Sequence, residues 1–180
     1  MEIRVDSERI TRLLTLIANT GVIVGLVFLA LEMQQTSAIA TAEARLAYSA
    51  GWRSVDESRQ DASFAEVLTK SIEAPEELSL TEVVRLDGYY SGILDQMLSA
   101  QTARATGIVD GPFTDVANSI GAIYFSNEFA RSWWMHVRSE WSQASGGRFQ
   151  QVVDNAILAG ELGRTQRMYE GIMNEITQQP

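Results

Sequence analysis

One stretch of the sequence limits the possible folds more than any other: residues 13–31 are 19 consecutive side chains without a formal charge. Arg12 precedes this stretch and Glu32 follows it, so charged side chains mark both of its ends. A helix rises about 1.5 Å per residue, and a stretch of this length therefore matches a hydrocarbon layer of roughly 30 Å. We expect a transmembrane helix at residues 13–33, after a short cytoplasmic N-terminus at residues 1–12.

Two other interpretations of this apolar stretch stay open. It could be the core helix of a soluble domain, although such a helix rarely stays uncharged on all sides over this length. It could also belong to a cleaved signal peptide, because residues 40–42 (Ala-Thr-Ala) have the small-x-small form of a cleavage site. That tripeptide lies well beyond the apolar stretch, which is itself longer than a usual signal core. We therefore favour an uncleaved membrane anchor.

The arginines beside the span give its expected orientation. Arg4, Arg9 and Arg12 precede it, whereas the first cation after it is Arg45. Cytoplasmic flanks of membrane helices are enriched in Lys and Arg. We therefore expect the N-terminus in the cytoplasm and the rest of the chain on the periplasmic side of a bacterial inner membrane. The cytoplasmic side is the alternative, because the difference is only three cations against one.

A pair of glycines inside the span is a candidate helix–helix contact. Gly21 and Gly25 are four residues apart, and Asn19 lies close to them in the sequence. Such a pair forms a flat groove in which another helix can approach closely, and an asparagine can add an interhelical hydrogen bond. Glycine is also common in membrane helices, so the pair can arise by chance. The expected partner is another membrane protein or a second copy of this chain.

The remaining residues, 34–180, predict an extramembrane helical bundle. Apolar residues recur at three- and four-residue spacing, and no alternating apolar pattern is long enough for a strand. Ser79 and Glu82 have the spacing of a capping box, and Ser126 or Asn127 is expected to cap another helix. The predicted fold class is all-α, with one N-terminal transmembrane helix continuing into a small bundle. We expect helices over residues 34–58, 62–72, 80–105, 113–124, 128–141, 148–159 and 162–176, the sixth after a break at residues 146–147.

Two short stretches and three further residues are distinctive: residues 27–36 (Val-Phe-Leu-Ala-Leu-Glu-Met-Gln-Gln-Thr), residues 131–134 (Arg-Ser-Trp-Trp), and Phe149, Val152 and Asp154. They resemble a set of uncharacterised bacterial single-pass membrane proteins. These proteins have an apolar helix that ends in a Leu-Ala stretch and continues into a Gln-rich, Ala-rich helix. The set usually carries an arginine at the membrane exit, where this chain has Gln34 and Gln35. The resemblance implies no activity, cofactor or catalytic residue.

The composition argues against several classes of function. The chain has no cysteine, which excludes disulfides and thiol catalysis. It has one histidine, His136, so it has too few His and Cys ligands for the usual zinc or di-iron sites. We place His136 on the polar side of its helix, as a solvated or capping residue. A net charge of −9 argues against nucleic-acid binding. The sequence contains neither a nucleophile elbow nor a phosphate-binding glycine loop. We therefore predict no catalytic residue, no metal site and no cofactor.

The densest aromatic cluster is formed by Trp133, Trp134 and Trp141, with Phe129 and Phe149 nearby. A ligand pocket or an interface is the functional interpretation of such a cluster, and core packing is the structural one. A helix that places Phe129, Trp133 and Trp141 on one face would leave Trp134 at the edge of that face. We therefore expect Trp133 to be deeply buried against the helix that carries Phe149, and Trp134 to be the more exposed.

These observations lead to two expected functions and one less favoured class. The first is a non-catalytic membrane-anchored module, a scaffold or accessory subunit that contacts lipid and binds another membrane protein or a second copy. The alternative is a membrane-tethered domain that binds a small ligand through its tryptophan cluster. An enzyme is the third class, for which the sequence offers no residue set.

Overall fold

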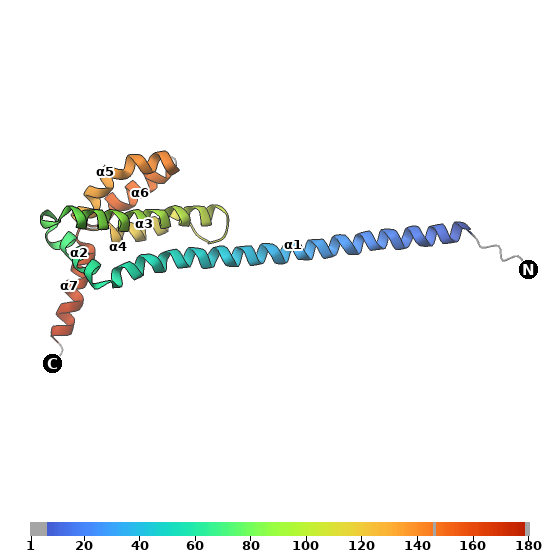
Figure 1. Cartoon of the computed structure of the whole chain (residues 1–180), viewed down its shortest axis with the longest axis horizontal. Helices are drawn as coiled ribbons and strands as arrows, with labels where there is room; N and C mark the ends of the chain where they lie inside the picture. The colour runs from blue at the N-terminus through green and yellow to red at the C-terminus, as the bar shows by residue number, and fades with distance from the viewer. Residues whose placement is uncertain (1–6, 146, 179–180) are drawn as a thin grey trace, which may run out of the picture. The chain divides into compact units, whose positions relative to one another are not determined.

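The computed structural model describes residues 7–145 and 147–178, and these residues contain seven α-helices, one 3₁₀ turn and no strand. The all-α prediction is therefore confirmed. The chain forms two compact units, Met1–Ala44 and Arg45–Pro180. Figure 1 labels the elements, which are α1 (Ser7–Gln60), α2 (Ala62–Glu73), the 3₁₀ turn η1 (Pro75–Glu77), α3 (Leu80–Ala105), α4 (Phe113–Tyr124), α5 (Glu128–Ser145), α6 (Gly147–Ala159) and α7 (Arg164–Thr177).

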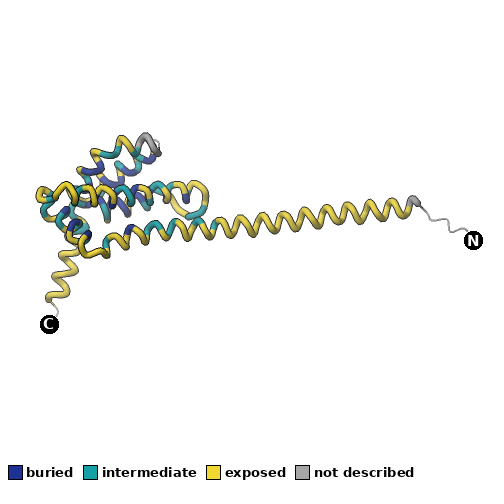
Figure 2. The backbone as a smooth tube through the Cα atoms, in the orientation of Figure 1, coloured by how far each residue is buried: buried dark blue, intermediate teal, exposed yellow. Residues whose placement is uncertain are grey.

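The first unit is helical throughout the residues described for it. The predicted membrane helix and its continuation are one uninterrupted helix, α1, because the stretch after Glu32 is rich in alanine and has no proline. The apolar part of α1 is long enough to span a membrane, and none of it is buried. Figure 2 shows this part as exposed along its whole length. The predicted N-terminus at residues 1–12 lies partly outside the described residues.

Residues 45–60 of α1 belong to the second unit and pack with it through one face. Val55 is buried, and the ring of Trp52 stacks on Tyr124 of α4 with 6.4 Å between the ring centroids. Gly51 faces the side chain of Gln96 on α3, and the amide group of Gln96 would have to move to admit a β-carbon at Gly51. By contrast, Leu46 is exposed, although it belongs to the apolar stripe visible in the sequence.

The next two helices begin at side-chain caps. Asp61 caps α2, because its carboxylate accepts a hydrogen bond of 2.8 Å from the backbone amide of Phe64. Ser79 and Glu82 form both hydrogen bonds of the predicted capping box at the start of α3. Gly107, which has a φ of 72°, lies two residues beyond the end of α3. The predicted bounds of α3 are thus confirmed to within a residue.

The core of the second unit lies between α3, α4, α5 and α6. Tyr90 of α3 is at its centre, and the rings of Phe125, Phe129 and Trp133 surround it at centroid distances of 5.3 to 6.1 Å. Helix α4 lies very close to α6 at Gly121, where a β-carbon would be 2.5 Å from the carbonyl oxygen of Ala156. Figure 1 shows α5 and α6 side by side.

The last helix, α7, is amphipathic but contributes no buried residue. Hydrogen bonds hold its first turn, because Thr165 accepts a bond from Ser126 and donates one to the carbonyl oxygen of Ile123, each 2.8 Å long. Figure 2 shows the rest of α7 as exposed. Apolar spacing along α4 favours Val116, Ile120 and Ile123 as inward residues, but Ile123 is 47% exposed, so this expectation is wrong for Ile123. The side of α4 that packs against α6 carries Ala117, Ile120 and Gly121 instead.

Candidate functional site

The tryptophan cluster is the first candidate site, and its two central members lie in the core. Trp134 is fully buried and Trp133 is 8% exposed, so the predicted order of burial is wrong. The indole N–H of Trp133 donates to Asp87 of α3, and that of Trp134 donates to Asp154 of α6, each over 2.8 Å. Helix α5 therefore buries two sides, one against α3 and one against α6, and the prediction of a single buried face is wrong.

The third tryptophan, Trp141, is partly buried and packs near Phe149, with 6.3 Å between the ring centroids. Phe149 also stacks on Phe113 of α4 at 5.9 Å. The clefts whose linings the structure describes contain none of the three tryptophans. The cluster thus contributes to the core, and it lines none of these described clefts.

A different cleft, of about 280 Å³, lies in the second unit where α1, α2, α4 and α7 meet. Arg59, near the end of α1, lies in this cleft, and we call it the Arg59 cleft. The guanidinium of Arg59 donates a hydrogen bond of 2.5 Å to the hydroxyl of Tyr169 on α7. It also lies over the ring of Tyr124, 5.6 Å from the ring centroid. Tyr89 of α3 completes the group of tyrosines that line the cleft.

Burial and hydroxyl groups together set the electrostatics of this cleft. Burial alone lowers the pKa of the Arg59 guanidinium, but the surrounding tyrosines outweigh this effect and raise the pKa above its ordinary value. Burial also raises the pKa of Tyr89 and of Tyr124, so both hydroxyl groups stay protonated at neutral pH. The cleft therefore contains the positive charge of Arg59 and several neutral hydroxyl groups, and Glu128 is an acidic member of its lining.

A groove of about 680 Å³ runs along α2 and α7 from the Arg59 cleft, and the two share Leu68, Ile72 and Tyr169 in their linings. We call it the α2–α7 groove. Met173 of α7 adds to its apolar wall, while Glu73 and Glu170 are acidic members of its lining. Arg59 lines both spaces, so the guanidinium lies where the cleft joins the groove.

The start of α7 is fixed in a way that keeps Tyr169 near Arg59. Gly163 precedes α7 with a φ of 74°, a backbone conformation that residues with a β-carbon rarely adopt. Its backbone amide donates a hydrogen bond of 2.6 Å to the carbonyl oxygen of Ser126.

Helix α5 begins at a side-chain cap. The side chain of Asn127 accepts a hydrogen bond of 2.8 Å from the backbone amide of Ala130, so Asn127 is the cap of the two candidates, Ser126 and Asn127, that the sequence offers.

The other residues singled out from the sequence are found on the surface. His136 is exposed, as predicted, and its Nδ1 atom is 2.8 Å from the carbonyl oxygen of Ser132. Asn19, Gly21 and Gly25 are exposed, and an added β-carbon at either glycine would have no atom within 4 Å. The helix–helix contact stays a prediction. Among the residues described, no group of three or more His, Cys, Asp or Glu side chains is placed to hold a metal ion.

Comparison with protein-family models, with curated proteins and with solved structures finds no match to this chain. The resemblance at residues 27–36 and 131–134 therefore stays a hypothesis.

The residues of the Arg59 cleft are not apparent as a group in the sequence. Arg59 and Tyr169 are 110 positions apart, and Tyr89 and Tyr124 lie on two further helices. One local signal existed, because Trp52, Val55 and Arg59 follow one another at three- and four-residue spacing on one side of α1. An arginine on an apolar helix face indicates a partly buried cation, but it does not indicate which side chains surround that cation.

Proposed function

We propose that this chain is a membrane-anchored, non-catalytic helical module that serves as a scaffold or accessory subunit of a membrane protein complex. The observation that carries the proposal is the uncharged stretch of α1, none of which is buried. Apolar area exposed to water costs about 25 cal/mol per Å². A helix that is apolar on all sides is stable and soluble only where lipid or protein covers it.

The expected topology follows from the arginines. With Arg4, Arg9 and Arg12 before the span, the N-terminus would lie in the cytoplasm and the second unit in the periplasm of a bacterium. The opposite topology is the alternative. The anchor would also bring Gly21 and Gly25 within the bilayer, where a partner helix could approach them.

Helix α7 supports the binding of a protein partner by the second unit. Its exposed apolar side chains form one face, which we call the α7 face, and none of them is buried. A partner that offers an apolar helix or groove would remove this face from water. Asn174 lies about 200° from Ile172 around the axis of α7, and it lines the α2–α7 groove. The α7 face consists of Met168, Tyr169, Ile172, Met173 and Ile176.

The test uses the full chain in cells. Membranes are washed with alkaline carbonate, and the chain is then crosslinked in place and analysed by mass. We expect the chain to stay in the washed membranes and to form one crosslinked species, whose mass identifies a partner or a second copy. Ile172→Glu should remove that species by placing a charge on the α7 face, while Asn174→Glu on the opposite side should keep it.

Two results would contradict the proposal, and a third would relocate the contact. Release of the chain by carbonate would exclude the anchor. A chain that never crosslinks would exclude the accessory role. Loss of the crosslinked species in Gly25→Ile but not in Ile172→Glu would move the contact from the α7 face to the membrane helix.

A further inference from the structure

Several cations of the second unit are joined to a carboxylate, and Arg59 is not among them. Ion pairs join Lys70 to Glu82, Arg85 to Asp61, Arg138 to Asp154 and Arg167 to Glu161. Within the part of the chain that the structure describes, no carboxylate lies within 4 Å of the Arg59 guanidinium. Its contacts are the hydroxyl of Tyr169 and the ring of Tyr124.

A half-buried guanidinium without a counter-charge is poised to bind an anion. Arginine carries five N–H donors in a planar fork that matches the two oxygens of a carboxylate. Tyr169 and Tyr124 engage only part of this fork. The Arg59 cleft offers space for the missing acceptor, and the protonated tyrosine hydroxyls offer further donors.

The space beyond Arg59 is shaped for an apolar tail. Leu68 and Ile72 of α2 line both the Arg59 cleft and the α2–α7 groove, and Met173 continues the apolar wall along α7. At about 680 Å³ the groove has the volume of sites that hold small ligands, roughly 300–1,000 Å³. A ligand with a charged head and an apolar tail would place the head at Arg59 and the tail in the groove.

The acidic residues of the linings limit the charge of that head. Glu128 lines the Arg59 cleft, and Glu73 and Glu170 line the α2–α7 groove. They would repel a second negative charge, such as that of a phosphate monoester. A single planar carboxylate satisfies Arg59 and adds the least repulsion.

We propose that the Arg59 cleft binds the carboxylate of an amphiphilic monocarboxylate, such as a medium-chain fatty acid, whose apolar tail lies in the α2–α7 groove. This inference goes beyond the proposed accessory function and does not depend on it. A chain that fails to crosslink to a partner would still bind the ligand, and a chain that does not bind the ligand could still associate.

The probe is decanoate, measured by equilibrium dialysis against the full chain in lipid nanodiscs, with empty nanodiscs subtracted. We expect one saturable site per chain. Decanol, which has the same tail length without the charge, should bind at least about tenfold more weakly, because charge-assisted hydrogen bonds are lost. Equal binding of decanol, or no saturable decanoate binding, would overturn the proposal.

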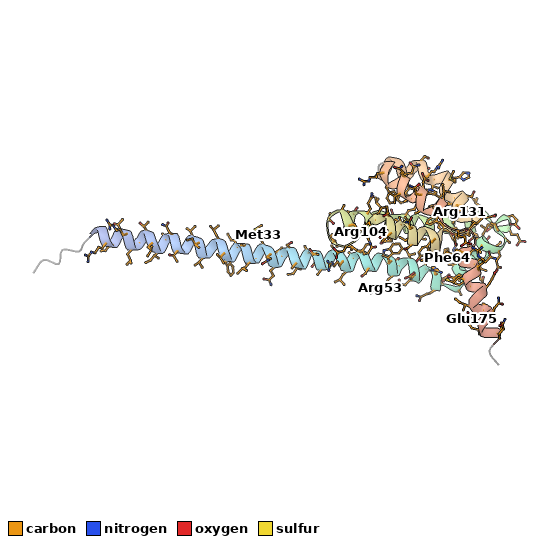
Figure 3. The ribbon with its side chains drawn as sticks, turned by 180° about the vertical axis from the view of Figure 1, so that it is seen from behind. Met33, Arg53, Phe64, Arg104, Arg131 and Glu175 are labelled. Carbon is orange, nitrogen blue, oxygen red and sulfur yellow. The ribbon has the colours of Figure 1, made fainter. Side chains whose placement is uncertain are left out.

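Variants of α1 locate the site. Arg59→Gln should weaken decanoate binding by about tenfold or more, since the amide keeps polarity but removes the charge. The matched control is Arg53→Gln, because Arg53 is exposed on the same helix (Figure 3) and lines neither the Arg59 cleft nor the α2–α7 groove. It should bind decanoate like the parent chain. Equal loss in both variants, or in neither, would contradict a site at Arg59.

A second variant covers the case in which Arg59→Gln unfolds the chain. Gln166 lines both the cleft and the groove, and Gln166→Trp would fill the space while it leaves Arg59 in place. We expect Gln166→Trp to weaken decanoate binding with an unchanged helical circular-dichroism spectrum. Unweakened binding would contradict the site.

Binding of short-chain phosphatidylglycerol distinguishes a lipid head group from a free carboxylate. Tighter binding of this lipid than of decanoate would overturn the assignment of a carboxylate.

Discussion

Helices α5 and α7 are both amphipathic, yet the second unit buries them in opposite ways. Helix α5 places Trp133 against α3 and Trp134 against α6. Helix α7 buries nothing and leaves large apolar side chains such as Ile172 and Met173 in contact with solvent. The spacing of apolar residues thus predicts that each segment is a helix. How much of a helix becomes buried depends on how many neighbours pack against it, which spacing does not reveal.

The strongest test of this comparison is the removal of Trp134. Trp134→Ala should lower the free energy of unfolding by about 3–5 kcal/mol, through lost contacts and the cavity left behind. Trp133→Ala should cost less than Trp134→Ala, because Trp133 is 8% exposed. On α7, Ile176→Ala should change stability by no more than about 0.5 kcal/mol. Urea unfolding of the full chain in detergent, followed by near-ultraviolet circular dichroism, measures all three variants.

Two results would break the comparison between α5 and α7. A large loss of stability for Ile176→Ala would mean that α7 packs against the rest of the unit in solution. A larger loss for Trp133→Ala than for Trp134→Ala would restore the order of burial that the sequence predicts.

A smaller effect is expected where α4 approaches α6. At Gly121 a β-carbon would be 2.5 Å from the carbonyl oxygen of Ala156, and this contact is with backbone that cannot turn aside. Gly121→Ala should therefore destabilise the chain by about 1–3 kcal/mol. The control is Gly88→Ala on α3, where an added β-carbon meets nothing within 4 Å. That change should stabilise α3 by up to about 1 kcal/mol, because alanine favours helix more than glycine does.

The same urea experiment measures the two glycine variants. If Gly121→Ala is as well tolerated as Gly88→Ala, then α4 and α6 are not in contact at this point. The close contact between α4 and α6 would then not help to hold α6 against α5, where Trp134 is buried.

Much of the fold was predictable because its signals are local. The capping box at Ser79, the turn at Gly107 and the apolar spacing of α3 each lie within a few residues of the structure that they specify. The two-sided burial of α5 was not predictable, because Asp87 and Asp154 come from helices on either side of it. The Arg59 cleft was not predictable for the same reason, because five separate segments of the chain contribute to its lining.

The smallest expected effect concerns the capping box, whose local interactions contrast with the long-range packing of α5. Hydrogen bonds from the hydroxyl and the backbone amide of Ser79, of 2.7 and 2.6 Å, together with Lys70, lower the pKa of Glu82 from 4.5 to about 2. A carboxyl group whose pKa is lower in the folded state stabilises that state above its unfolded pKa. This stabilisation is lost as the pH falls from about 4.5 toward 2.

Glu82→Gln should therefore lower the urea midpoint of the full chain at pH 7, and the difference from the parent chain should narrow steadily below about pH 4.5. The control is Glu140→Gln, because Glu140 is exposed on α5 and should shift the midpoint little at any pH. A difference for Glu82→Gln that stays constant from pH 7 to pH 3 would mean that the charge contributes nothing. In that case the start of α3 would be held by the Ser79 hydroxyl and by apolar packing alone, and an uncharged cap would serve α3 as well as Glu82 does.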